Sequence, residues 1–510
     1  MGSPVSFFKS LSGMARDYPR DRMPEGYVWD LADYVPTLLD AALTGRGAWS
    51  WYSAAHPAGI EGGIHAPFKS GDKLITIAGG NIYEVNVSTG AVSPIAGGTG
   101  LSPIKQNPVM HRDRVIIFDG VNLPKIVTST PAFAVAAAPA TAKAFKYGSV
   151  YKDRVIGANY PGEEQQIRFS PVGNPTTDWD VNSYWNTSLP LTGIGALRAV
   201  ILLFHQGSVE RIRGSTPPST LGGDGDMSLE NMFDRAGCGD ARSIAYWNDN
   251  CIFADERGVH LTDGAIVRNL ISQGGMLTFW RTLFRNRQTI TAASYLDFYI
   301  TTIVRTDGGV VTLICDLPKR AWFRFTNIKA ISYIQSVGEQ ERLWAGIEPD
   351  HRLAALADCF FPPLTLPTSV LTDANGVAVL PLVETPWYRM AQEGRKRSRF
   401  VYTSYDSRIP PGATAMGWRA DIDQVAQQQS EAAVQAVQQM LEVGYMTSPN
   451  EQTYTIAGRL PDTQRYKRYR LPIGMHPYGI AFRIRQIAPS TVTRVFDFAV
   501  EAAPEERSRV

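Results

Sequence analysis

The sequence predicts an all-β protein, with a β-propeller of six or seven blades followed by a C-terminal β-sandwich that carries a helical or flexible insertion. Three observations support this prediction. A hairpin-like unit recurs through the first two thirds of the chain, a Pro-rich run ends that series, and alternating apolar segments follow it. We expect an N-terminal arm over residues 1–44, the propeller over 45–362 and the sandwich over 363–510.

The repeated unit is a short apolar strand that begins after a polar turn, as in HRDRVIIFDG and YKDRVIGANY. A second strand follows each Gly-, Asp- or Asn-containing turn, which is the pattern of a β-hairpin. Equivalent positions, spaced by 41, 40, 45, 51, 47 and 45 residues, are Leu74, Val115, Val155, Val200, Cys251, Phe298 and Leu343. This spacing is the length of a four-stranded blade, and the units lack the side-chain ladder of a solenoid.

The two ends of the repeat region carry further signals. Residues 45–52, GRGAWSWY, are expected to supply a strand that closes the ring against the last blade, since closure covers open sheet edges. The arm before them mixes prolines with large apolar residues, so we expect it to order on a neighbouring subunit. The arm residues expected to make that contact are Trp29, Tyr34, Leu38, Leu39 and Leu43.

The C-terminal region begins after the Pro-rich run FPPLTLPTSV, which is typical of an inter-domain linker. Segments such as SRFVYTSY and YGIAFRIRQIA then alternate apolar and polar residues, as the strands of a two-sheet sandwich do. Residues 421–444 interrupt them and are rich in Ala, Gln and Glu, which favours a helical insertion with Val434, Val437 and Leu441 on one face. A mobile Gln/Ala-rich loop is the alternative.

Composition restricts the class of protein. Hydrophobic residues make up 44% of the 510 and charged residues 19%, as in folded globular proteins. The net charge of +2 argues against a protein whose main task is to coat nucleic acid or an anionic membrane. No apolar run approaches the roughly 18 residues that span a bilayer, and we expect assembly in a cytoplasm. Four widely spaced cysteines indicate buried free thiols.

Motifs of catalysis are not found. The sequence contains no GxSxG, HExxH, P-loop or dinucleotide GxGxxG, and its seven histidines are scattered, so structural roles are favoured for them. Asp224 and Asp226 in LGGDGDMSLE suit a solvated turn better than a calcium site, because further spaced oxygen ligands are missing. We therefore assign no catalytic residue, cofactor or metal.

Two basic clusters are candidate partner contacts. They comprise Arg395, Lys396 and Arg397 in GRKRSRF, and Arg465, Tyr466, Lys467, Arg468 and Tyr469 in RYKRYR. Cations with rings between them can hold nucleic acid. The low net charge favours half-buried strands that face a protein partner, and nucleic-acid contact is expected only if the clusters face a lumen.

Three segments resemble propeller-containing tail proteins of double-stranded-DNA bacteriophages: MPEGYVWDLADYVPTLLDAALTGRGAWSWYS, GCGDARSIAYWNDNCIFADERGVHLTDGA and YKRYRLPIGMHPYGIAFRIRQIAPSTVTRVFDFAVE. The similar proteins are minor tail proteins of long-tailed actinobacterial phages and, more distantly, tail hub or nozzle proteins of short-tailed phages. The likeness covers nearly the whole chain, and the Gln-rich insertion departs from it.

The resemblance implies a structural subunit of a virion tail, not an enzyme, assembled in the bacterial host cytoplasm. Its partners would be other phage tail proteins and further copies of itself in a ring or trimer. Two other interpretations stay open. One is a carbohydrate-binding or glycan-cleaving propeller that recognises a host-surface glycan, for which Trp179, Tyr184 and Trp185 form a candidate aromatic cluster. The other is a cytoplasmic propeller scaffold.

Overall fold

The chain is described by a computed structural model. The described residues are 5–6, 12–19, 22–24, 26–36, 43–103, 108–129, 133–139, 141–219, 225–271, 275–336, 342–360, 373–375, 379, 382–384, 388–389, 396–408, 439–446, 454–461, 467–475, 479–486 and 492–504. The regular structure within these residues consists mostly of antiparallel sheets, which confirms the all-β class.

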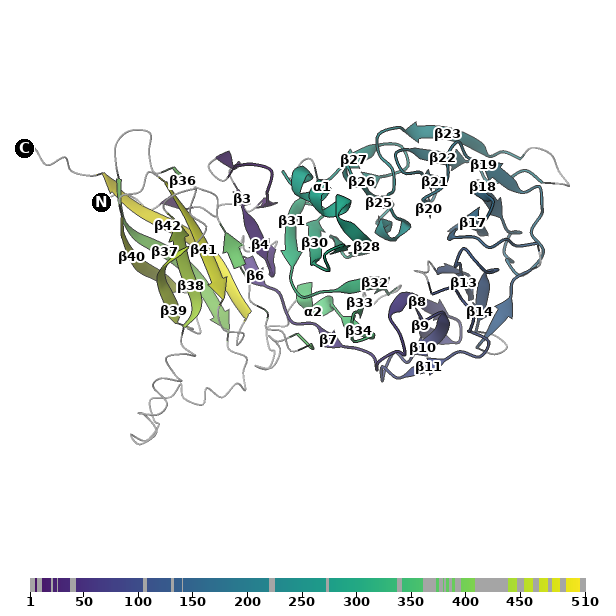
Figure 1. Cartoon of the computed structure of the whole chain (residues 1–510), viewed down its shortest axis with the longest axis horizontal. Coiled ribbons are helices and arrows are strands. Elements are labelled where there is room, and N and C mark those ends of the chain that lie inside the picture. Colours follow the sequence, from purple (N-terminus) through teal and green to yellow (C-terminus); the bar gives the residue numbers. More distant parts are fainter. Residues whose placement is uncertain are drawn as a thin grey trace, which may run out of the picture.

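Seven units of four antiparallel strands follow one another around a ring within the described residues (Figure 1). The first three are β8 (Ile60–Phe68), β9 (Gly71–Ala78), β10 (Asn81–Val85) and β11 (Val92–Pro94); β12 (Val109–His111), β13 (Arg114–Ile117), β14 (Lys125–Thr128) and β15 (Ala134–Ala137); and β16 (Tyr147–Tyr151), β17 (Arg154–Tyr160), β18 (Glu163–Phe169) and β19 (Tyr184–Asn186).

The remaining four units complete the ring. They are β20 (Gly193–Ala196), β21 (Val200–Phe204), β22 (Val209–Arg213) and β23 (Ser228–Phe233); β24 (Ala245–Trp247), β25 (Asn250–Asp255), β26 (Gly258–Thr262) and β27 (Val267–Asn269); β28 (Arg287–Tyr295), β29 (Phe298–Arg305), β30 (Val310–Asp316) and β31 (Ala321–Phe325); and β32 (Ala330–Gln335), β33 (Leu343–Ile347), β34 (Arg352–Ala355) and β7 (Ser50–Trp51).

The repeat read from the sequence coincides with these units. Its seven equivalent residues, from Leu74 to Leu343, each lie in the second strand of their unit, and each is buried. The strand expected to close the ring is also present, because β7 pairs antiparallel with β34 through Trp51 opposite Ala354 and Ser50 opposite Ala355. The last unit is thus completed by residues that precede the first.

Aspartates in the turn between the first two strands of a unit connect neighbouring units. In three cases such an aspartate accepts a hydrogen bond from the preceding unit. The donor lies in the equivalent turn of that unit or in its first strand. The three pairs are Lys69 N to Asp113 Oδ1 at 2.9 Å, Arg112 Nε to Asp153 Oδ1 at 2.8 Å, and Trp247 Nε1 to Asp297 Oδ1 at 3.1 Å. The repeated polar turn therefore also serves as a contact between adjacent sheets.

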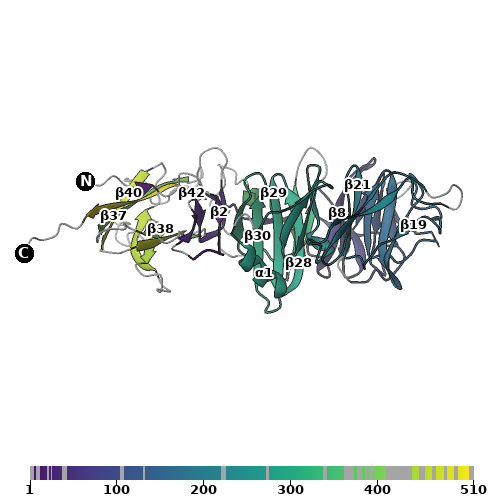
Figure 2. The same cartoon turned by 90° about the horizontal axis from the view of Figure 1, so that it is seen from above.

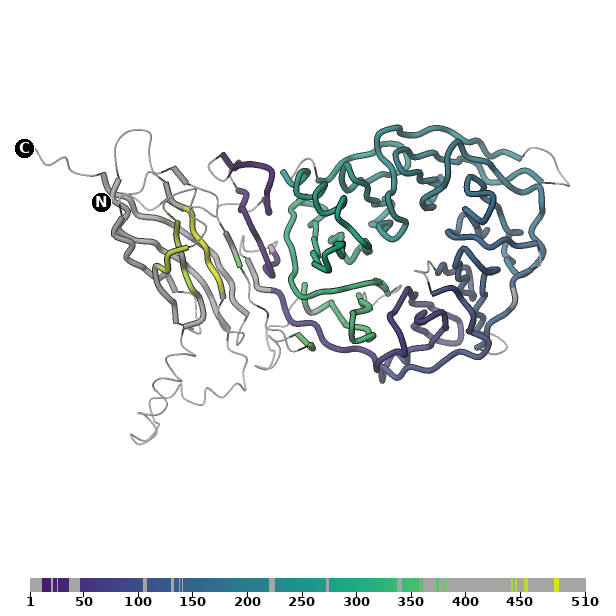
Figure 3. The backbone as a smooth tube through the Cα atoms, in the orientation of Figure 1, coloured from purple at the N-terminus to yellow at the C-terminus, as the bar shows by residue number. Residues whose placement is uncertain are grey.

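The sixth unit extends beyond the ring. Its outer strand β31 lies parallel to the arm strand β4 (Asp30–Ala32), and β4 pairs on its other side with β35 (Leu382–Glu384). The ten-stranded sheet continues through β41 (Gly479–Gln486), which also pairs with β36 (Tyr388–Arg389), then β38 (Gln439–Met446) and β39 (Thr455–Pro461). Strand β4 of the arm thus lies between the ring and the C-terminal strands (Figures 1 and 3).

A second sheet in the C-terminal region also contains arm strands. Its order is β40 (Lys467–Met475), β37 (Lys396–Arg408), β42 (Val492–Pro504), β6 (Leu43–Gly45) and β5 (Tyr34–Pro36), and β1 (Val5–Ser6) pairs with β42. A short parallel pair, β2 (Gly13–Met14) and β3 (Tyr27–Val28), lies beside β31. Seen from above, the C-terminal strands, the arm and the ring lie in a row (Figure 2).

The prediction of a helix over residues 421–444 is wrong for residues 439–444, the part of this segment that the structure describes. Gln439–Gly444 belong to β38, which pairs with both β39 and β41, and residues 421–438 lie outside the described residues. Leu441, Val443 and Tyr445 alternate with polar or small residues, so this end of the segment has a strand pattern. Cross-strand pairing outweighs the helix-forming composition there.

Helices are short in the described chain. They are η2 (Ala241–Ser243), α1 (Leu277–Arg285) and α2 (Ala357–Phe360). None of them has the length and apolar character that crossing a membrane requires. Trp280 and Phe284 of α1 are buried against the ring, and Trp280 Nε1 donates to the backbone oxygen of Asp255 at 2.8 Å.

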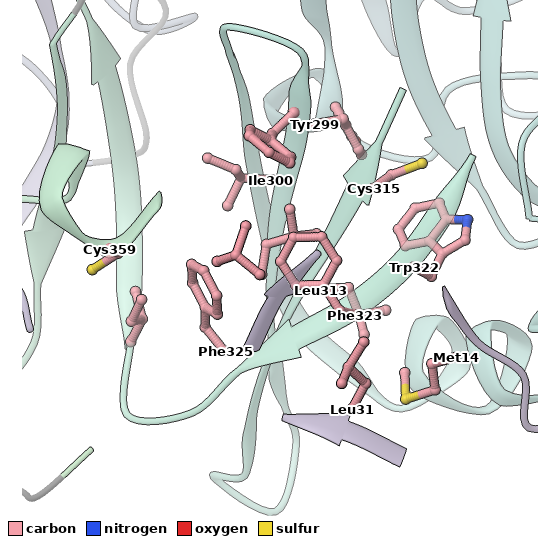
Figure 4. Close-up of a cluster of buried hydrophobic side chains, with 14 of the residues drawn as sticks. Met14, Leu31, Tyr299, Ile300, Leu313, Cys315, Trp322, Phe323, Phe325 and Cys359 are labelled. Atoms are coloured by element: carbon pink, nitrogen blue, oxygen red, sulfur yellow. The ribbon is translucent and has the colours of Figure 1, made fainter. Parts of the chain in front are cut away.

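One hydrophobic cluster runs through all three parts of the chain. It includes Met14 and Leu31 from the arm, Trp322 from the ring, and Phe482 from the C-terminal strands. Figure 4 shows Leu31 and Met14 packed beside Trp322 and Phe323. Within this cluster the ring centroid of Phe360 lies 5.0, 5.2 and 5.5 Å from those of Phe298, Phe325 and Tyr295. The arm therefore shares a core with the ring.

Replacing Phe360 by Ala should lower the free energy of unfolding by about 3–5 kcal/mol, because the buried ring would leave a cavity. Chemical denaturation measures this loss. Val121→Ala is the matched control: Val121 is 62% exposed, and its replacement should change the free energy by less than about 0.5 kcal/mol. Equal effects of the two substitutions would contradict the packing described.

Candidate functional site

A buried arginine ties the arm to the ring and to the segment after it. Arg46, fully buried, donates Nε to Asp33 Oδ1 at 2.6 Å, and its two terminal nitrogens donate to the two carboxylate oxygens of Asp373 at 2.9 and 2.7 Å. The same terminal nitrogens donate to the backbone oxygens of Gly47 at 3.0 Å and Thr326 at 3.1 Å. All five guanidinium donors therefore have partners.

The two carboxylates are equally well satisfied. Asp33 accepts the backbone N–H of Thr326 at 2.8 Å and the Thr326 hydroxyl. Asp373 accepts the backbone N–H of Trp49 at 3.1 Å and the Asn327 side-chain amide at 2.8 Å. Residues 33, 46, 326, 327 and 373 thus form one network, called here the arm junction, which joins three stretches far apart in sequence.

Electrostatics at the arm junction favour its charged form. Burial alone lowers the pKa of Arg46, but the charges of Asp33 and Asp373 outweigh it and raise that pKa above its ordinary value. Cys359 lies beside the network, with Sγ 3.9 Å from Arg46 Nη1, and burial raises the pKa of its thiol to about 12. The cysteine is therefore a neutral neighbour and not a thiolate partner of the arginine.

A second ion pair holds β4 against the ring. Arg324 of β31 donates Nε and Nη2 to the two oxygens of Asp30 at 2.8 and 2.9 Å. Arg16 lies 3.9 Å from the same carboxylate and places its guanidinium 5.0 Å from the centroid of the Trp29 ring. A two-pronged arginine–carboxylate pair fixes orientation as well as distance, so it sets the position of β4.

The arm residues predicted to touch a neighbouring subunit dock within the chain where they are described. Tyr34 is fully buried in the shared core, Trp29 is half-buried under Arg16, and the backbone of Leu43 pairs with Val495 in β42. Leu38 and Leu39 lie outside the described residues. The apolar surface that Tyr34 covers thus belongs to its own chain, and contact of the arm with a neighbouring subunit stays a prediction.

The two basic clusters lie on neighbouring strands but not side by side. Lys396 and Arg397 begin β37, whereas Lys467, Arg468 and Tyr469 begin β40; Arg395, Arg465 and Tyr466 lie outside the described residues. In the antiparallel register Ser398 faces Met475 and Ser404 faces Arg468. Six residues of strand, about 20 Å, separate the two levels. The backbone therefore does not merge the clusters into one patch.

The aromatic residues proposed for glycan binding do not form one platform. Trp179 is 3% exposed, stacks on Phe145 with centroids 5.3 Å apart and donates Nε1 to the backbone oxygen of Pro175. Trp185 is half-buried, and Tyr184 is 37% exposed. Trp179 instead lies in the wall of a groove of 460 Å³ between the β18–β19 and β22–β23 loops, called here the loop groove.

The scattered polar residues have structural partners. His205 Nε2 lies 3.2 Å from Glu210, and His260 Nε2 lies 2.8 Å from Asp255. Asp226 accepts backbone N–H groups of Ser215 and Thr216, and these bonds lower its pKa to about 2. Asp224 lies outside the described residues. No group of three or more metal-ligating side chains occurs in the described part of the chain.

The four cysteines are free and buried, as the sequence indicated. Burial raises the pKa of Cys238 to about 12 and raises the thiol pKa values of Cys251 and Cys315 as well. Protonated thiols are poor nucleophiles. None of the four is therefore a candidate nucleophile.

No protein-family model and no curated protein matches the chain. Among solved structures, the computationally designed Ika8 protein matches over 61% of this chain and 99% of its own, with 11% sequence identity and a TM-score of 0.38. A likeness at that TM-score supports no conclusion about fold or function.

Asp373→Ala should destabilise the protein by about 3–5 kcal/mol, because it leaves a buried arginine without half of its charge partners. Hydrogen exchange followed by mass spectrometry should show the loss first in residues 28–36 and 43–49, since the arm depends on this network. Asp350→Ala removes an exposed carboxylate of the same type and serves as the control. Unchanged protection of these two stretches would rule out the arm junction as the tether.

Native protein at pH 8 should react with a thiol reagent at none of its four cysteines, and all four should react in denaturant. The reason is that the thiols are buried and, with pKa values raised, protonated at that pH. Asp373→Ala should speed the labelling of Cys359 before that of Cys238. Fast labelling of the native wild-type protein would contradict the burial.

Proposed function

We propose that the chain is a structural subunit of a bacteriophage tail, a minor tail, tail-tip, hub or nozzle component that assembles by contacts with other tail proteins. The resemblance of the three segments named above supports this assignment. The observation on the structure that carries it is the arm strand β4, which is paired to the ring on one side and to the C-terminal strands on the other.

Such a connection suits a load-bearing part. A flexible linker lets two domains move independently, whereas a shared sheet and a shared core resist relative motion. Here β4, the Arg324–Asp30 pair and the arm junction all bridge the same boundary. A subunit that keeps its two halves in a fixed relation can dock several neighbours at once.

We further infer that the ring is a seven-bladed β-propeller and that the two C-terminal sheets form a β-sandwich. Seven similar four-stranded units around a ring, with a closing strand from the N-terminal side, support the propeller. Copies of such a subunit would assemble as a ring or trimer in the virion, because closed symmetry repeats one interface many times.

Cryo-electron microscopy of purified particles tests the proposal. We expect the ring and the C-terminal strands to fit density in the tail in several symmetric copies, and we expect particles made without the gene to lack an intact tail. Mass spectrometry that finds the protein in lysates but never in purified particles would contradict a structural role.

Removing the arm does not test contact with a neighbouring subunit. Deletion of residues 1–44 also removes Asp33, β4 and β5, which the chain needs for its own core. Loss of incorporation would then follow from unfolding. The informative variants keep the arm and alter exposed positions instead.

A second candidate function is recognition of a host-surface carbohydrate, which the loop groove favours. Its volume of 460 Å³ falls within the about 300–1,000 Å³ typical of small-molecule sites, and its wall combines carboxylates, hydroxyls and apolar surface. A glycan array with the purified protein is the test. Binding to a defined glycan supports carbohydrate recognition. An array without hits rejects this second candidate and keeps only the structural role in the tail.

A further inference from the structure

One positively charged side chain in the loop groove has no charge partner. Arg154, the first residue of β17, is half-buried and donates Nη1 to the backbone oxygen of Ser170 at 2.8 Å. Among the described residues no carboxylate forms an ion pair with it, and burial is what lowers its pKa. A half-buried cation of this kind offers its remaining donors to an anion from outside the chain.

Acidic side chains of the same groove do not neutralise Arg154. Asp178 and Asp180 lie in the β18–β19 loop, and Asp178 accepts a hydrogen bond from the Thr141 hydroxyl at 3.2 Å. Asp178 is exposed, and an ionised carboxylate can accept about four hydrogen bonds. It can therefore accept hydroxyl donors of a ligand as well.

Apolar surface completes the groove. Val181 is 56% exposed beside Asp180, and Pro171 lines the same groove. The aliphatic face of a sugar ring can lie on such side chains, since its C–H groups lose water there. The groove thus presents one cation, one hydrogen-bond-accepting edge and one apolar surface.

We propose that the loop groove binds an acidic saccharide, with the sugar carboxylate on Arg154, ring hydroxyls donating to Asp178, and a C–H face on Val181. This inference rests on the carbohydrate-recognition candidate and names its ligand class. A single carboxylate accompanied by several hydroxyls matches the groove. A polyanion such as an acidic peptide or nucleic acid fits less well, because the exposed carboxylate of Asp178 repels repeated negative charge.

Isothermal titration of the full chain tests the proposal with three acidic oligosaccharides: an oligogalacturonate, a glucuronate-containing chain and a sialylated one. We expect at least one to bind. Its methyl ester, which has the same skeleton without the charge, should bind at least tenfold more weakly. Arg154→Gln should cause a similar loss, and Asp178→Asn a smaller one.

Arg268→Gln is the matched control, because Arg268 is exposed on β27, outside the groove, and its loss changes net charge equally. Thermal unfolding confirms that each variant is folded. Equal binding of the methyl ester, or equal losses in the Arg154 and Arg268 variants, would overturn the inference. Stronger binding of a poly-glutamate peptide than of any saccharide would assign the groove to a protein partner and overturn it too.

Failure of this inference can be told from failure of carbohydrate recognition itself. Neutral glycans that bind on an array with no dependence on Arg154 would keep recognition and reject the acidic ligand. No binding by any acidic or neutral glycan would reject both. Neither result bears on whether the protein is found in virion tails.

Discussion

The bidentate contact between Arg46 and Asp373, completed by Asp33, is the interaction on which the arrangement of this chain depends. It connects residues 327 positions apart and fully removes three charged groups from water. Charges buried in this way cost free energy unless each is paired and hydrogen-bonded, and here each is. The network therefore specifies where the arm lies. Its contribution is position more than stability, since well-packed apolar residues of equal volume would stabilise the fold as much.

From that tether the other features follow. With the arm held, Asp30–Ala32 reach β31 and add a strand to the ring, and β35 adds the C-terminal strands to it. The shared core then covers Leu31 and Tyr34, which would otherwise expose large apolar surface. Charge pairing selects the position, and burial supplies most of the stability.

The parts that the sequence could predict are those with local signals. Polar turns such as Arg112-Asp113 and Lys152-Asp153 mark the hairpins, so the positions of seven second strands could be predicted. The aromatic segment 45–52 indicated the closing strand. The arm junction was not foreseeable, because Asp33, Arg46 and Asp373 carry no shared motif. Strand β4 has three residues, too few for any periodicity to appear.

The candidate sites show the same division. The aromatic residues near Trp179 lie in a loop that lines the loop groove, but their burial could not be predicted from the sequence. Arg154 has no sequence signal, because a single arginine in a strand belongs to no motif. The helix expected over 421–444 failed at Gln439–Gly444 because pairing with β41 depends on residues about 40 positions away.

The closing strand has a consequence for how the protein is made. Ser50 and Trp51 leave the ribosome some 300 residues before Ala354 and Ala355, their partners in β34. Until β34 has been synthesised, β7 has no partner strand and the ring cannot close. Because unpaired strand edges invite pairing with other chains, nascent copies emerging near one another on a polysome are at risk of exchanging this strand. Spacing between translating ribosomes, and not stability alone, would then govern the yield of correctly closed rings.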